Sequence, residues 1–146
     1  MSTFPSTVLC AVDGSKESDL ALRHVVDLVA GREVDVHVVH VGLVSPWTNP
    51  RTMSGQQVDR LRADAQQVLD GQVARLRELG VDPSGTHLRM GRATDEILRL
   101  RDEIDADLVV IGSRGLNTFA RVLLGTDAEA VVRHAPCAVL VVRRDR

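Results

Sequence analysis

Short apolar runs alternate with longer amphipathic segments along the whole chain, and this alternation restricts its fold more than any other feature. A run that is apolar throughout is typical of a strand buried on both faces of a sheet. The runs predict strands at residues 7–12, 34–41, 86–90, 107–112 and 138–142. Between them, apolar residues recur three or four positions apart, which predicts helices at residues 15–29, 58–79, 94–104 and 127–134.

Strands that alternate with helices favour a parallel sheet, because each parallel neighbour must be reached by a crossover connection, and such crossovers are right-handed. The pattern therefore predicts an open, doubly wound, Rossmann-like α/β fold with a five-stranded parallel sheet. A chain of 146 residues suits one hydrophobic core, so we expect a single domain over residues 1–146. Periodicity does not give the order of the strands in the sheet.

Turn residues mark several of the expected boundaries. Ser15 is suited to cap the start of the first helix, and Gly31 and Gly80 follow the ends of the first two helices. Residues 42–54, which contain Pro46, Trp47 and Pro50, are expected to form a loop that is long enough to be functional.

Charge and composition argue against several classes of function. The 18 basic and 20 acidic side chains give a net charge of −2, so no overall positive field exists to attract nucleic acid or an anionic membrane. Aromatic residues are too few to form a platform on which single-stranded bases stack. The chain has no stretch of about 18 apolar residues and no leader-like start, so we expect a cytoplasmic protein with no membrane partner.

The cysteines and histidines do not suggest a metal site. Cys10 and Cys137 lie in apolar runs at opposite ends of the chain, without a partner at metal-ligand or redox spacing, so we expect buried structural thiols. His37 and His40 are three residues apart in an expected strand and should therefore point to opposite faces. We assign no metal ligands.

Two expected strand ends carry residues suited to ligand binding. Asp13-Gly14-Ser15 follows the first strand, and Gly112-Ser113-Arg114-Gly115 follows the fourth. In open parallel sheets, ligands bind beyond the carboxyl ends of the strands, where the winding direction reverses. If the first and fourth strands are neighbours, both groups face one crevice, together with Gly125-Thr126 at the start of the last helix.

The groups that follow the fourth strand have the chemistry of a phosphate site. Gly112 and Gly115 allow a ligand to come close to the backbone, and the helix start at Gly125-Thr126 offers unpaired N–H groups to an anion. Arg114 adds a guanidinium suited to bidentate contact with a phosphate.

Structural explanations fit the same residues equally well. Gly112 and Gly115 can be ordinary turn residues, and residues 126–129, Thr-Asp-Ala-Glu, fit a capping box that needs no ligand. Asp13 before Gly14 is likewise a common turn-forming pair. The functional alternatives for Asp13 are a hydrogen bond to a ribose and the binding of a metal.

Familiar phosphate and nucleophile motifs are absent. No Gly-x-x-x-x-Gly-Lys-Ser/Thr and no Gly-x-Gly-x-x-Gly follows the first strand, which argues against a P-loop nucleoside triphosphatase and a nicotinamide dehydrogenase. Residues 112–115 are one residue short of a Gly-x-Ser-x-Gly elbow, so we assign no catalytic residue.

The spacing of the glycines resembles the ATP-binding type of the universal stress protein family. Gly112, Gly115 and the pair Gly125-Thr126 match its Gly-x2-Gly-x9-Gly-Ser/Thr pattern, and residues 12–15, 106–115 and 133–142 are also similar to it. The resemblance, which covers nearly the whole chain, implies the strand order 3-2-1-4-5 of the adenine nucleotide alpha hydrolase-like folds. It also implies a homodimer joined at the fifth strand, residues 138–142.

The resemblance implies a role for each candidate site residue. Ala11 and Asp13 would approach the adenine and the ribose, and the backbone of Val41 would contact the adenine. The phosphates would lie against Gly112, Ser113, Arg114, Gly115, Gly125 and Thr126. Asp127 departs from the family pattern, which usually has a small or apolar residue there, and it brings an anion close to the phosphates.

Together, these features predict a regulatory, adenine-nucleotide-binding protein of the stress response. Its ligand is expected to be ATP, or alternatively AMP or ADP, with or without Mg²⁺, and the nucleotide would modulate dimer formation or binding to a protein partner. The alternatives are an interaction protein of the same family that binds no nucleotide, and an ATP-hydrolysing enzyme of related fold. An ATP pyrophosphatase would need a Ser-Gly-Gly-x-Asp-Ser loop, which residues 12–18 do not provide.

Overall fold

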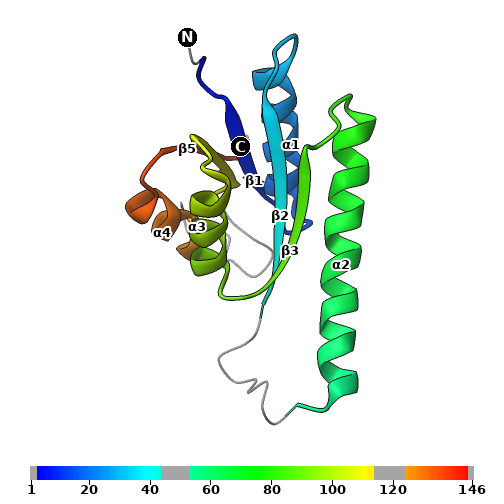
Figure 1. Cartoon of the computed structure of the whole chain (residues 1–146). Helices are drawn as coiled ribbons and strands as arrows, with labels where there is room; N and C mark the ends of the chain where they lie inside the picture. Colours follow the sequence, from blue (N-terminus) through cyan, green and yellow to red (C-terminus); the bar gives the residue numbers. More distant parts are fainter. Residues whose placement is uncertain (1–2, 44–52, 114–123, 145–146) are drawn as a thin grey trace.

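All the expected strands and helices occur in the computed structural model, which describes residues 3–43, 53–113 and 124–144 (Figure 1). The strands are β1 (Thr7–Ala11), β2 (Asp35–Leu43), β3 (Gly85–Gly91), β4 (Leu108–Gly112) and β5 (Ala138–Val142). The helices are α1 (Lys16–Val29), α2 (Gly55–Glu78), α3 (Ala93–Ile104) and α4 (Thr126–His134). Every pair of neighbouring strands is parallel, and the order β3-β2-β1-β4-β5 is the one that the family resemblance implied.

Helices cover both faces of this sheet. α1 and α2 pack on one face, and α3 and α4 pack on the other (Figure 1). Successive residues of β1 point to opposite faces, so Cys10 lies in the core beneath α1 and α2, and Leu9 lies in the core beneath α3 and α4. This burial on both faces explains why the central strands are apolar throughout.

β2 is longer than the sequence predicted, because it ends at Leu43 rather than at Val41. Its last residues pair with β3 as far as Leu43 with Gly91, whereas β1 already ends opposite Val39. β2 therefore extends past the end of β1 at the carboxyl edge of the sheet. Residues 44–52 of the expected loop lie outside the described residues.

α2 begins at Gly55, ahead of Val58, where its apolar pattern starts. A capping box sets this earlier start. The Ser54 hydroxyl accepts from the N–H of Gln57 at 3.1 Å, and the Gln57 side chain accepts from the N–H of Ser54 at 2.9 Å. The periodicity missed this turn because its residues are polar, although the Ser-x-x-Gln signature is present.

The other helix boundaries lie within one residue of those predicted. Ser15 is the N-cap of α1, and its hydroxyl accepts from the N–H of Ser18 at 3.1 Å. Gly31 and Gly80 lie just past the ends of α1 and α2, with φ angles of +70° and +101°. Such left-handed angles strain any residue that has a Cβ atom, which is why glycine ends these helices.

The two cysteines differ in burial. Cys10 is fully buried, as expected, and burial raises the pKa of its thiol to about 12. Cys137 is only partly buried, so the expectation of a buried thiol is wrong for this residue. The reason is its place directly before β5, an edge strand whose outer side is covered by none of the described strands.

His37 and His40 point to opposite faces of the sheet, as their spacing predicted. His37 Nδ1 lies 2.9 Å from Nε2 of His87 on β3, and His40 Nδ1 lies 2.7 Å from the carbonyl oxygen of Val12. Within the described ranges, no group of three or more His, Cys, Asp or Glu side chains is placed to hold a metal ion. None of the described helices is long and apolar enough to cross a membrane.

Candidate functional site

β1 and β4 are neighbours, so the residues that follow them meet at one edge of the sheet. β2 lies on one side of this pair and β5 on the other, and the winding direction of the chain reverses between β1 and β4. Asp13 follows β1 at this switch point, and Ser113 follows β4. Arg114 and Gly115, two of the predicted phosphate contacts, lie outside the described residues.

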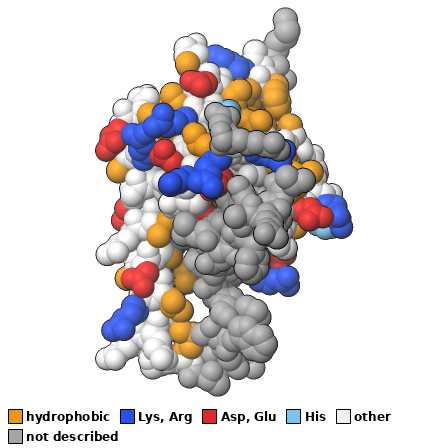
Figure 2. All heavy atoms as spheres, turned by 180° about the vertical axis from the view of Figure 1, so that it is seen from behind, with side chains coloured by type: hydrophobic (Ala, Val, Ile, Leu, Met, Phe, Trp, Pro, Cys, Tyr) orange, Lys and Arg blue, Asp and Glu red, His pale blue; other side chains and the backbone are white. Residues whose placement is uncertain are grey.

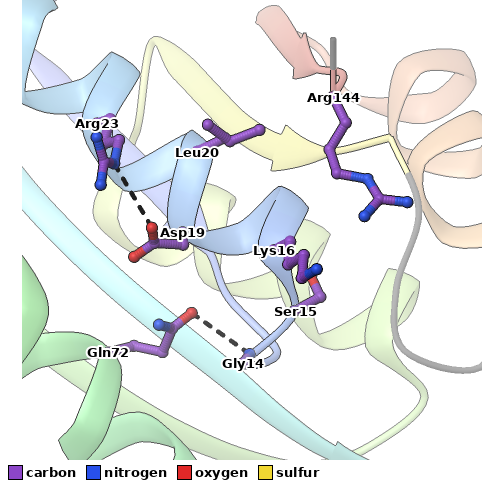
Figure 3. A pocket seen from close by; sticks show the side chains of 8 residues that line it. All are labelled: Gly14, Ser15, Lys16, Asp19, Leu20, Arg23, Gln72 and Arg144. Atoms are coloured by element: carbon purple, nitrogen blue, oxygen red, sulfur yellow. Dashed lines mark hydrogen bonds and ion pairs between the residues drawn. The ribbon is translucent and has the colours of Figure 1, made fainter. Parts of the chain in front are cut away.

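Side chains satisfy the backbone donors of the turn that follows β1. The N–H of Asp13 donates to the Ser18 hydroxyl at 3.0 Å, and the N–H of Ser15 donates to Asp13 Oδ1 at 2.9 Å. The N–H of Gly14 donates to Oε1 of Gln72, on α2, at 3.3 Å (Figure 3). Because each of these donors already has an acceptor, the turn has no N–H group left for a phosphate.

Asp13 is suited to accept hydrogen bonds from a ligand. Its half-buried carboxylate uses Oδ1 to accept from Ser15, and none of the described residues donates to Oδ2. An ionised carboxylate has acceptors only. The bond to Ser15 also makes Asp13 the turn former that its sequence suggested, and this structural role occupies only one of the two carboxylate oxygens. The second carboxylate oxygen matches a hydroxyl donor such as that of a ribose.

β2 presents backbone groups beyond the end of β1. The carbonyl oxygen of Val39 accepts from the N–H of Val12 at 2.9 Å, so the polar groups of Val39 point toward β1. Alternate residues of a strand direct their polar groups to the same side, so those of Val41 point the same way. β1 pairs only as far as Ala11, opposite Val39. Val41 therefore offers a donor and an acceptor to the edge of a planar base at this point.

Gly112 is a glycine because α1 packs directly against it. A Cβ atom at this position would lie 2.8 Å from Cβ and 3.1 Å from the backbone carbonyl carbon of Glu17. Gly112 is also a paired residue of β4, opposite Val142, so its interpretation as an ordinary turn glycine is wrong. The close approach to the backbone that the sequence suggested here is made by a helix.

Ser113 connects the end of β4 to the start of α4. Its N–H donates to the carbonyl oxygen of Val142 at 2.7 Å, and its own carbonyl oxygen accepts from the N–H of Gly125. Its side chain is buried. These bonds hold the first residue of α4, Thr126, at the same edge of the sheet as the end of β4.

The capping box expected at residues 126–129 does not form. α4 already begins at Thr126, and the N-cap is Gly125, which has no side chain to accept a hydrogen bond. The first bond within the helix runs from the N–H of Glu129 to the carbonyl oxygen of Gly125 at 2.9 Å. Within the described part of the chain, no acceptor faces the N–H groups of Thr126, Asp127 and Ala128. These donors and the helix dipole favour an anion.

Asp127 is exposed and is tied to the neighbouring helix. Its Oδ1 accepts from the hydroxyl of Thr94, on α3, at 2.8 Å. An acidic side chain in the first turn of a helix is favourable in itself, because it lies near the positive end of the helix dipole. Asp127 thus has a structural role in addition to its place beside the predicted phosphate site.

Two residues that hold the Asp13 turn, Ser18 and Gln72, were not predicted from the sequence. Ser18 donates its hydroxyl hydrogen to Oε1 of Gln72. A signal for Gln72 was present, because it is a polar residue in a stripe of α2 that is otherwise apolar. Gln72 is buried, and so are the other members of this stripe, which are Ala65, Leu69, Val73 and Leu76.

An open hollow of about 500 Å³ lies against the same turn, on the side of α1 and α2 (Figure 3). Its lining combines basic and acidic side chains with the turn itself: Gly14, Ser15, Lys16, Asp19, Leu20, Arg23, Gln72 and Arg144. Arg144 pairs with the buried Glu17 at 2.8 Å, and Arg23 pairs with Asp19 at 3.5 Å. Figure 2 shows basic and acidic side chains mixed on the upper part of the face seen from behind.

The fold and this edge of the sheet together define a class of protein. It is a doubly wound, Rossmann-like α/β protein with polar groups gathered at the switch point between β1 and β4. The chain belongs to the universal stress protein family, whose family model matches residues 6–143.

Relatives and solved structures agree with this assignment. A protein of Staphylococcus haemolyticus that is named as a universal stress protein is 32% identical over 94% of this chain and 84% of its own length. A universal stress protein of Lactobacillus plantarum has the same fold, with a TM-score of 0.83 and 23% identity over 97% of this chain and 100% of that chain. The universal stress protein of Archaeoglobus fulgidus in complex with dAMP is 25% identical, with a TM-score of 0.67 over 96% and 99% of the two chains.

Proposed function

We propose that this protein binds an adenine nucleotide in the crevice between the carboxyl ends of β1 and β4, with ATP as the main ligand and AMP or ADP as alternatives. The observation that carries the proposal is that the two sides of this crevice offer opposite hydrogen-bonding groups, acceptors on one side and donors on the other. The turn at Asp13 offers a carboxylate acceptor and no backbone donor, whereas the start of α4 offers backbone donors without a cap. A ribose fits the first side and a phosphate fits the second. The dAMP complex of the Archaeoglobus fulgidus relative supports an adenine nucleotide.

The orientation of the nucleotide follows from this polarity. The ribose hydroxyls donate to Asp13, and the adenine lies near Ala11 with its edge against the backbone of Val41. The phosphates then extend toward the end of β4 and the start of α4, where the proposed contacts are Gly112, Ser113, Arg114, Gly115, Gly125 and Thr126. Mg²⁺ would accompany ATP and neutralise part of the phosphate charge.

The nucleotide is proposed to regulate assembly rather than to be turned over rapidly. β5 is an edge strand that is apolar throughout and contains neither Lys nor Pro, which are the residues that usually protect such an edge. Pairing with β5 of a second copy would cover it. We propose a cytoplasmic regulatory role in which ATP changes dimer formation or the binding of a protein partner.

The test is to identify what the purified protein carries and what it binds. Mass spectrometry of the small molecules released on denaturation should detect an adenine nucleotide, and calorimetric titration should give a dissociation constant for ATP, ADP and AMP. Asp13→Ala should weaken all three, because all three contain the same ribose hydroxyls. A protein that releases no nucleotide and gives no heat of binding with any of them would contradict the proposal.

A second candidate is an interaction protein of the same family that does not bind nucleotide. The observation that favours it is Asp127, whose charge lies in the first turn of α4 beside N–H groups that have no acceptor among the described residues. The same titration separates the two candidates, because this second candidate predicts no binding of the parent protein but binding after Asp127→Ala.

A further inference from the structure

Gln72 is a polar residue buried in the apolar stripe of α2. It is 9% exposed, and its neighbours along the stripe, Leu69 and Leu76, contribute to the core between α2 and the sheet. A leucine or methionine would satisfy the packing at this position, whereas a buried amide is unfavourable unless it is hydrogen-bonded. The amide is therefore explained by what its oxygen contacts.

The hydrogen bonds of the Gln72 side-chain oxygen connect it to the turn that carries Asp13. Oε1 of Gln72 accepts from the N–H of Gly14 at 3.3 Å and from the hydroxyl of Ser18 (Figure 3). The Ser18 oxygen in turn accepts from the N–H of Asp13 at 3.0 Å. A hydroxyl has one hydrogen, so its donation to Gln72 turns the Ser18 lone pairs toward Asp13. The N–H of Gly14 can only donate, which fixes the oxygen of the amide, not its nitrogen, on this side.

We propose that Gln72 is a positioning residue for ribose recognition, an inference that rests on the proposed function. Through Ser18 and Gly14 it holds the turn after β1, so that the Asp13 carboxylate faces the ribose hydroxyls. The hydrogen bonds of Gln72 reach the turn and not the start of α4, so its effect belongs to the ribose end of the nucleotide. Gly14 is exposed, so its N–H can bind water when the Gln72 acceptor is removed.

The experiment compares ATP with 2′,3′-dideoxy-ATP, which lacks both ribose hydroxyls, by calorimetric titration. Gln72→Met keeps the volume and the apolar packing but removes the acceptor. We expect this variant to bind ATP about tenfold more weakly than the parent, which is the effect of losing one well-oriented hydrogen bond to a charged group. Its affinity for dideoxy-ATP should remain within about twofold of the parent value. Gln72→Glu keeps an oxygen that accepts from both donors, so the ratio of its affinities for ATP and dideoxy-ATP should match that of the parent.

Controls separate positioning from general damage. Gln67→Met introduces the same side chain at an exposed position of α2 and should change neither affinity. Ser18→Ala breaks the same connection from α1 and should reproduce the loss for ATP, which also serves as the test if Gln72→Met does not fold. In an Asp13→Ala background, Gln72→Met should have no further effect, because the group that it positions is gone.

Three outcomes would overturn the inference. An equal loss of affinity for ATP and dideoxy-ATP would show that Gln72 supports the crevice as a whole. Unchanged ATP affinity in both Gln72→Met and Ser18→Ala would show that the turn is held without them. A parent protein that binds neither nucleotide would refute the proposed function itself, and this inference with it.

Discussion

Gly112 lies where β4 packs directly against α1, and a side chain there has no room. The atoms nearest to an added Cβ atom are Cβ and backbone atoms of Glu17. They cannot move away as the end of a flexible side chain could. We expect Gly112→Ala to lower the free energy of unfolding by about 1 to 3 kcal/mol, measured by urea denaturation. Gly71→Ala, at an exposed position of α2 where an added Cβ atom meets no other described part of the chain within 4 Å, is the matched control and should raise stability slightly. Equal stability of the Gly112 variant and the parent would refute the packing explanation.

Asp127 is the residue whose negative charge we expect to repel bound phosphates most strongly. Two unit charges about 6 Å apart at an effective dielectric constant of about 20 repel by roughly 3 kcal/mol. Mg²⁺, solvent and the helix dipole offset part of this, so we expect Asp127→Ala to strengthen ATP binding by roughly five- to thirtyfold, and AMP binding by less. Calorimetric titration with and without Mg²⁺ measures this effect.

Thr94→Val is the control for this prediction, because it removes the hydrogen bond to Asp127 and keeps the charge. If Asp127 instead helps to hold Mg²⁺, Asp127→Ala would weaken Mg-ATP and strengthen metal-free ATP. Identical affinities of parent and variant with and without Mg²⁺ would show that Asp127 only stabilises the start of the helix and does not affect the ligand.

At the scale of elements, a contact between two histidines on β2 and β3 should make the stability of the fold depend on pH. His37 and His87 stack with ring centroids 5.2 Å apart, and Arg89 is paired with Glu103 beside them. Burial, the neighbouring His37 and the charge of Arg89 lower the pKa of His87, whereas Glu103 opposes the shift. The folded state thus favours neutral His87. As the pH falls below about 6.5, the usual pKa of histidine, the unfolded chain takes up this proton first, and the folded state loses stability.

His87→Gln should therefore flatten the fall in stability between pH 7.5 and the folded pKa of His87. Urea denaturation at a series of pH values measures the slope for the parent and for the variant. His134→Gln, at an exposed position in α4, is the control and should retain the parent slope. An unchanged slope in the His87 variant would show that this contact does not contribute to the acid sensitivity.

At the scale of the whole molecule, the open edge of β5 decides whether two copies pair. The carbonyl oxygen of Val142 accepts from Ser113, so the polar groups of Val142 and Leu140 point toward β4 and those of Val141 point outward. Val141→Pro removes an outward N–H group and keeps the bonds to β4. Light scattering at micromolar concentration should give a dimer for the parent and a monomer for Val141→Pro. A monomeric parent would refute dimer formation through this strand.

The alternation of apolar runs and amphipathic segments was enough to predict the parallel α/β architecture and nearly all the helix and strand positions. It succeeds because burial on both faces forces a strand to be apolar throughout, and burial on one face forces a helical period of three to four residues. The short motifs at residues 12–15 and 112–126 also placed the candidate site. The family resemblance then supplied the strand order, which periodicity does not contain.

Only the tertiary structure showed what the site residues contact. Gly112 is required by Glu17, which is far from it in sequence, and the Asp13 turn is held by Gln72 from another helix. The start of α4 lacks a cap because Gly125, not Thr126, precedes its first turn. A local pattern records which face of an element is buried, but not which residue of another element lies against it. That pairing arises when the packed sheet brings distant segments together.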